Sequence, residues 1–156
     1  MGKRLGVLSA AIAVAALVVG GVSAAAGSSG NDDQHQTLRV DAIVTELNLV
    51  PVSPKGPSLG DEIVFSEKLL QGGTEVGHQG AVCTTVSLAR QEAQCSATYA
   101  FGDGQITAQA LIILGSKAPY DGAITGGSGT YEGAGGVVHV RPVSDTEGIL
   151  TFDLQD

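Results

Sequence analysis

Three polar side chains, Glu46, Asn48 and Glu67, lie in segments rich in apolar and β-branched residues. Glu46 and Asn48 are two residues apart, so in a strand they would share one face. Inside an apolar cavity a carboxyl group has a raised pKa, and two nearby carboxyl groups can share a proton and act as an acid–base pair. The spacing predicts all three near one mouth of a cavity. The alternative is that both glutamates lie at strand ends in solvent.

Eight short segments rich in β-branched residues predict the strands that must position these side chains, because Gly, Pro and Asp clusters separate them. They lie near residues 38–50, 61–70, 80–88, 95–102, 105–114, 121–126, 136–143 and 148–155. The fold class is therefore all-β, either an eight-stranded antiparallel barrel of the calycin type or a sandwich. A closed barrel has no exposed edges, and one of eight strands is just wide enough to hold a small ligand.

Alternation along these strands predicts a mostly apolar inner wall, of the kind that binds small molecules. The inward set is Val40, Ala42, Val44, Glu46, Asn48, Ile63, Phe65, Glu67, Cys83, Cys95, Ala97, Tyr99, Phe101, Ala108, Ala110 and Ile112. The outward set includes Ile43, Leu47, Leu49, Val82, Val86 and Leu88. Apolar residues on the outside of a barrel predict packing between subunits, hence a homo-oligomer.

The two cysteines, Cys83 and Cys95, fall on the inward face of one expected hairpin, about equally far from its turn. That parity permits a cross-strand disulfide, and free thiols are the alternative. No histidine stands at metal-ligand spacing from either cysteine, so no metal site is expected.

A glycine-rich run, residues 123–136, leads into a strand that begins Val137-Val138. Its six glycines surround Tyr131, which predicts a folded corner with positive φ angles or close backbone contacts. It is not a phosphate-binding loop, because no Lys-Ser/Thr follows it, and no cofactor is expected.

Four motifs in order carry a resemblance to the allene oxide cyclase barrel family, which is related to the dirigent proteins. They are Gly60-Asp61-Glu62-Ile63-Val64-Phe65-Ser66, Val76-Gly77-His78-Gln79-Gly80-Ala81-Val82-Cys83, Ala97-Thr98-Tyr99-Ala100-Phe101 with its Gly-Asp-Gly turn, and the glycine-rich corner. The resemblance implies a small barrel around a hydrophobic molecule. The plant relatives are trimers, so it also implies a trimer.

The resemblance also implies roles for single residues. In the plant enzymes a glutamate and an asparagine two residues on, with a Ser-Pro loop and a second asparagine, hold a water that anchors an epoxide oxygen. Here the first pair corresponds to Glu46 and Asn48, the loop to Ser53-Pro54, and the second asparagine to Glu67. A cavity tyrosine of the family corresponds to Ile112, so one polar group is lost. Phe65, Cys83 and Tyr99 complete the expected ligand-binding set.

The chain of 156 residues carries a formal net charge of −8, which disfavours nucleic acid and anionic lipid surfaces as partners. Residues 1–26 resemble a secretory signal peptide, with a basic start, an apolar stretch and small residues at the end. An uncleaved membrane anchor is the alternative. Residues 27–36 are expected to be a flexible lead, and residues 37–156 the barrel of a secreted protein.

These observations predict a barrel that binds a small hydrophobic, oxygenated molecule and guides its cyclisation or isomerisation by shape and electrostatics. Two further hypotheses remain: a non-catalytic carrier or dirigent-like barrel with the same cavity, and a structural protein whose barrel is filled by side chains.

Overall fold

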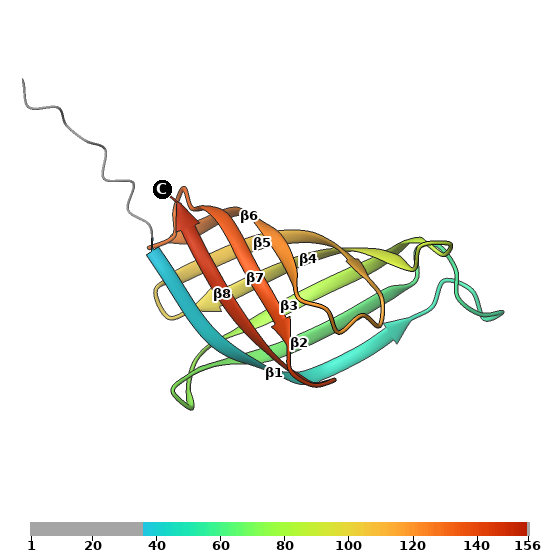
Figure 1. Cartoon of the computed structure of the whole chain (residues 1–156), viewed down its shortest axis with the longest axis horizontal. Coiled ribbons are helices and arrows are strands. Elements are labelled where there is room, and N and C mark those ends of the chain that lie inside the picture. The colour runs from blue at the N-terminus through green and yellow to red at the C-terminus, as the bar shows by residue number, and fades with distance from the viewer. Residues whose placement is uncertain (1–35, 156) are drawn as a thin grey trace, which may run out of the picture. The chain divides into compact units, whose positions relative to one another are not determined.

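The computed structural model describes residues 36–155, which form one closed barrel of eight antiparallel strands in sequence order (Figure 1). The strands are β1 Gln36–Val50, β2 Glu62–Gln71, β3 Thr74–Ser87, β4 Glu92–Phe101, β5 Gly104–Ile113, β6 Tyr120–Gly129, β7 Gly135–Pro142 and β8 Glu147–Gln155. Pairing of β1 with β8 closes the barrel. The predicted fold class is thus confirmed, and the sandwich alternative was wrong.

Two predicted strand limits were wrong because glycines allow tighter turns than expected. β3 begins at Thr74, not near residue 80, since Gly72 and Gly73 both have positive φ and form a two-residue hairpin turn. β6 continues to Gly129, through half of the glycine-rich run. At Gly127 a Cβ atom would lie 2.1 Å from the carbonyl oxygen of Tyr131, so only glycine fits this corner.

A β-bulge in β1 changes which side chains face the barrel interior. Val44 pairs with Glu67, but the next pair is Glu46 with Ser66, so Thr45 is an extra residue. The Thr45 hydroxyl lies 3.1 Å from the carbonyl oxygen of Ser66 and 3.0 Å from its hydroxyl. β1 bends partway along its length in Figure 1. Beyond the bulge, the alternation expected from the sequence is reversed.

The hydrophobic core fills the end of the barrel where all eight strands pair. Its largest fully buried side chains are Phe152, Leu69, Ile106, Val40 and Val138. The rings of Tyr99 and Phe152 pack edge to face with centroids 4.8 Å apart. This part of the barrel, called here the packed end, supplies the rigid scaffold.

The opposite part, called here the open end, begins where two ladders stop. Pairing of β1 with β8 ends at Ile43 and Glu147, and pairing of β5 with β6 ends at Gln109 and Ala123. β1 to β5 continue past these points, and β6 to β8 do not pair with the continued parts of β1 and β5. β2 to β5 supply most of a cavity wall, which β6 and β7 complete, and β1 to β5 present much of the exposed apolar surface.

The expected signal peptide, residues 1–26, and the lead up to residue 35 lie outside the described residues, whereas Gln36 already belongs to β1. Within residues 36–155 there is no helix of the length and hydrophobicity that crossing a membrane requires.

Candidate functional site

A cavity of about 120 Å³ lies inside the barrel on the open-end side of the core. Small side chains form part of its wall, so space that larger residues would fill there stays free. The small residues are Ala81, Ala97, Ala108, Ala110 and Gly122. Of the side chains expected to bind a ligand, Phe65, Cys83, Tyr99 and Ile112 line this wall.

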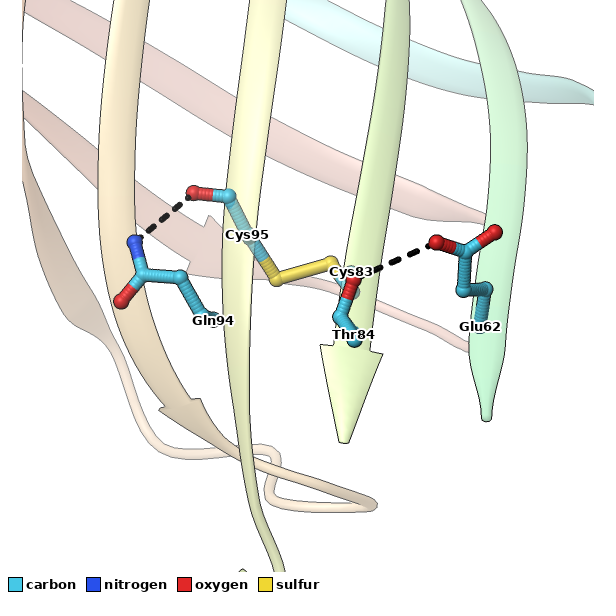
Figure 2. Close-up of a disulfide and its surroundings, with 5 residues drawn as sticks. All are labelled: Glu62, Cys83, Thr84, Gln94 and Cys95. Carbon is cyan, nitrogen blue, oxygen red and sulfur yellow. Dashed lines mark hydrogen bonds between the residues drawn. A yellow bond between two sulfur atoms is a disulfide. The ribbon is translucent and has the colours of Figure 1, made fainter. Parts of the chain in front are cut away.

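A disulfide joins Cys83 and Cys95 across β3 and β4 (Figure 2). Both residues line the cavity. The two cysteines are directly opposite one another in the ladder, with Cα atoms 4.0 Å apart. The predicted pairing is confirmed, and residues 36–155 contain no free cysteine. The bond ties two strands of the cavity wall together.

Glu67 lies on the inner face of β2, between Phe65 of the cavity and Leu69 of the core. Burial raises its pKa to about 7. Its carboxyl group can therefore both accept and release a proton near neutral pH. Glu67 is not part of the cavity wall itself, but its neighbour across the ladder, Gln79, is.

Gln79, Tyr99 and Tyr120 complete a polar layer next to Glu67, and all three line the cavity. Gln79 pairs with Glu67 on one side and with Tyr99 on the other. Burial raises the pKa of both tyrosines, and the charge of nearby Glu67 raises it further. The sequence interpretation missed Gln79 and Tyr120. For Gln79 the signal was available, since it alternates with Ala81 and Cys83 on β3.

Glu46 and Asn48 lie elsewhere, which corrects the expectation that they share the inner face with Val40, Ala42 and Val44. They line a groove of about 540 Å³, together with Val64, Ser66 and Val82. Both side chains are exposed, and their register partners are Ser66 and Val64. The Thr45 bulge is the cause, because one extra residue exchanges the two faces of a strand. Leu47 and Leu49, expected outside, instead pair with Phe65 and Ile63 of the inner face.

Ser53 and Pro54 line a second groove, of about 560 Å³, beneath the loop that joins β1 to β2. Asp61 holds this loop in shape. Its carboxylate accepts hydrogen bonds from the backbone N–H groups of Val52 and Ser58 and from the Ser58 hydroxyl, at 2.8, 2.7 and 2.6 Å. These bonds lower the pKa of Asp61. The Ser-Pro loop therefore has a defined conformation beside the open end.

A third groove, of about 400 Å³, lies at the mouth of the cavity. It shares Ile63, Ile112 and Tyr120 with the cavity wall, so the two spaces adjoin. An ion pair between Lys117 and Asp145 links two loops at this end. The cavity and this mouth groove together form the candidate site.

His139 lies outside the cavity, on the surface of β7. Its Nδ1 is 2.7 Å from a carboxylate oxygen of Asp121 and its Nε2 is 3.2 Å from one of Asp153. The hydrogen bond with Asp121 is the main cause of its raised pKa. The described residues hold no group of three or more His, Cys, Asp or Glu side chains that could bind a metal ion.

Comparison with known proteins identifies the fold. Residues 38–152 match the model of the "Allene oxide cyclase barrel like domain" family. A structure titled "Pyocyanin demethylase" has 27% sequence identity and a TM-score of 0.69, covering 76% of this chain and 99% of that one. No curated protein matches the chain.

Two further solved structures share the fold at lower identity. A pterocarpan synthase dirigent protein has 19% identity and a TM-score of 0.61, covering 78% of this chain and 88% of that one. The Diels-Alderase AbmU from Streptomyces koyangensis has 14% identity and a TM-score of 0.61, covering 80% of this chain and 70% of that one. With the family model matching most of the barrel, the chain belongs to the allene oxide cyclase barrel-like family.

Proposed function

We propose that this protein is a secreted barrel that binds a small hydrophobic, oxygenated molecule in its interior and guides its cyclisation or isomerisation. The observation that carries the proposal is a mostly apolar cavity whose wall residue Gln79 pairs in the ladder with a half-buried carboxyl group. Burial raises the pKa of that group, Glu67, to about 7. Such a group can serve as general acid and general base at the pH of most extracellular fluids.

Catalysis would have two contributions, one from the shape of the cavity and one from electrostatics. The apolar wall would select one folded conformer of the substrate, which lowers the entropy lost on reaching a cyclic transition state. Protonated Glu67 would donate a hydrogen bond toward a developing alkoxide, and its ionised form would stabilise a developing cation. Tyr99 and Tyr120 stay protonated because their pKa values are raised, so they can act only as hydroxyl groups.

The similar proteins support the proposal in outline. One is titled a demethylase, one a dirigent protein and one a Diels-Alderase, so barrels of this fold are named for reactions of small organic molecules. A fold by itself hosts many chemistries, and the particular reaction has to come from the site.

A chiral product analysis tests the proposal. The purified protein is mixed with a freshly generated fatty-acid allene oxide, and the enantiomeric ratio of the resulting cyclopentenone is measured. Uncatalysed closure gives a racemate. We expect an excess of one enantiomer that falls to a racemate in Glu67→Gln and persists in Glu75→Gln, a control on an exposed position of β3. A racemate with the native protein at saturating concentration would contradict a cyclase of this type.

The pair Glu46 and Asn48 is tested separately from Glu67. The family resemblance assigns it a catalytic role, whereas it lines a groove that shares only Phe65 and Ala81 with the cavity wall. Loss of enantiomeric excess in Glu46→Gln but not in Glu67→Gln would indicate that the reaction takes place in that groove. The reverse result would assign it to the cavity.

A non-catalytic carrier or dirigent-like barrel is the second candidate. The observation in its favour is that no carboxyl group belongs to the cavity wall itself. A carrier would bind an apolar fluorescent probe equally well as the native protein and as Glu67→Gln, without any change in product ratio.

Secretion and self-association are part of the proposal. The disulfide accords with an oxidising compartment. The apolar outer residues Val64 and Val82, paired across β2 and β3, are exposed and would suit a contact between subunits. Sedimentation of the protein as a monomer at all concentrations would refute the homo-oligomer.

A further inference from the structure

Gln79 places an unpartnered hydrogen-bond acceptor on the cavity wall. The residue is 4% exposed, and its Oε1 is the one fully buried side-chain nitrogen or oxygen of residues 36–155 that has no hydrogen-bond partner. Buried polar atoms are nearly always satisfied, because an unmade hydrogen bond in a low-dielectric interior is unfavourable. A bound molecule that supplies a donor would remove this penalty.

Few protein groups around Gln79 could donate a hydrogen bond to its Oε1. The residues that share the inner face with it on β3 are Ala81 and Cys83, and the cysteine sulfur is engaged in the disulfide. The other glutamine of the wall, Gln109, is an exposed residue on β5. Glu67 and Tyr99 flank Gln79 in the ladders, yet neither donates a hydrogen bond to it in the structure. Gln79 thus brings an unpartnered, buried acceptor to a cavity wall that also carries the hydroxyl groups of Tyr99 and Tyr120.

The size of that space limits what can reach Gln79. The cavity measures about 120 Å³, and cavities of about 150 Å³ in other proteins hold one benzene ring. One ring, or a chain of similar volume, fills it. Any larger part of a ligand would extend into the mouth groove, which shares Ile63, Ile112 and Tyr120 with the cavity.

We infer that the ligand is a small apolar molecule that enters the barrel with a hydroxyl or N–H group leading, and that Gln79 is the positioning residue that accepts its hydrogen bond. This inference rests on the proposed interior site and adds a substrate class to it. An ether, ketone or epoxide group offers Gln79 Oε1 no hydrogen atom, so a substrate that carries such a group has to reach Gln79 with a separate hydroxyl or N–H group. A ligand whose polar group is a donor is bound in a single orientation.

Phenol and toluene provide the test, because they differ by a hydroxyl in place of a methyl group of similar size. Binding of each to the full chain is measured by NMR titration. We expect phenol to bind about 3- to 10-fold more tightly than toluene, the gain that one neutral hydrogen bond provides. Gln79→Met, of similar shape, should abolish this preference. Gln105→Met, at an exposed position on β5, should leave it unchanged.

The outcomes separate this inference from the proposed function. Equal binding of phenol and toluene to the native protein overturns the donor requirement and leaves the interior site intact. Tighter binding of benzaldehyde, which only accepts hydrogen bonds, overturns the role of Gln79 as acceptor. Failure of all three probes to saturate overturns both proposals.

A measurement on the native protein avoids reliance on a variant that folds poorly. At saturation, the side-chain amide resonances of Gln79 should shift more with phenol than with toluene, because only phenol can donate a hydrogen bond to Oε1. Amide resonances of Gln105 should move with neither probe, and equal shifts of the Gln79 signals with both probes would contradict the inference.

Discussion

The two ends of this barrel are built from the same eight strands, yet one is a filled core and the other holds a cavity. At the packed end, all strands pair and the interior carries large side chains such as Phe152, Leu69 and Ile106. At the open end, two ladders stop and the interior carries alanines and a glycine among larger residues such as Phe65 and Tyr120. The contrast shows that the cavity arises from small side chains placed where pairing ends, on a scaffold that the packed end keeps rigid.

Glu67 and Gln79 lie at the boundary between these two regions. On one side they adjoin core residues, which exclude water. On the other they adjoin the cavity, which can hold a ligand. A polar group at this boundary is buried enough for its pKa to change and accessible enough to meet a substrate. The following predictions test how far the two ends differ, from the largest expected effect to the smallest.

Two isoleucines on the same face of β5 give a matched comparison of the ends. Ile106 is 0% exposed in the core, whereas Ile112 lines the cavity and the mouth groove. We expect Ile106→Ala to lower the free energy of unfolding by about 3–5 kcal/mol and Ile112→Ala by about 1 kcal/mol, because only the first creates a new void in packed surroundings. Urea titration measures the free energy of unfolding of both variants. Equal losses in the two variants would contradict the difference between the packed end and the open end.

The disulfide should stabilise the open end mainly by restricting the unfolded chain. It links residues 12 apart in sequence, Cys83 and Cys95. We expect Cys83→Ala/Cys95→Ala to lose about 2–4 kcal/mol of unfolding free energy. Thermal unfolding with and without reductant checks this. Reductant should lower the melting temperature of the native protein and leave that of the double variant unchanged.

Stability should depend on pH through Glu67. Its pKa is about 7 in the folded protein against an ordinary value of 4.5, so the folded state favours the protonated carboxyl group. Stability is therefore greatest below about pH 4.5, falls as the pH rises toward 7, and levels off above it. The loss from this group is at most about 3 kcal/mol.

Melting temperatures of native protein and Glu67→Gln across that pH range measure this effect. Glu67→Gln should remove the decline between pH 4.5 and pH 7, whereas Glu75→Gln should retain it. A decline of the same size in all three proteins would assign the pH dependence to other groups.

Filling the cavity should affect binding far more than stability. Ala97 lines the cavity and has room beside it. We expect Ala97→Leu to weaken binding of an apolar fluorescent probe at least about 10-fold while changing the free energy of unfolding by less than about 1 kcal/mol. Ala123→Leu, at an exposed position on β6, is the control and should bind normally. Unchanged binding in Ala97→Leu would place the probe outside the cavity.

Much of the architecture could be predicted from local pattern. The eight strands and their all-β class follow from alternation and turn residues along single segments, and parity permitted the pairing of Cys83 with Cys95 that the structure shows. The inward position of Phe65 and Ile112 follows in the same way, because no bulge interrupts their alternation before the cavity. The family likewise could be inferred from motifs in their order.

The bulge at Thr45 is what the sequence pattern could not reveal. Thr45, Glu46 and Leu47 continue an ordinary strand composition, and the extra residue is detected only from the partners on β2. Those partners are about twenty residues away in sequence, so their register is a long-range property of the closed barrel. The side chains after the bulge therefore exchange faces, and Glu46 and Asn48 line an outer groove.

By itself the sequence determined the number of strands and the apolar character of the wall, and it permitted the disulfide, because each depends on residues close together along the chain. The tertiary structure alone decided where the barrel opens, which polar residues border the cavity, and that burial raises the pKa of Glu67 to about 7. These features depend on which strands end beside one another and on how much water remains around a side chain. Both are set only when all eight strands have closed.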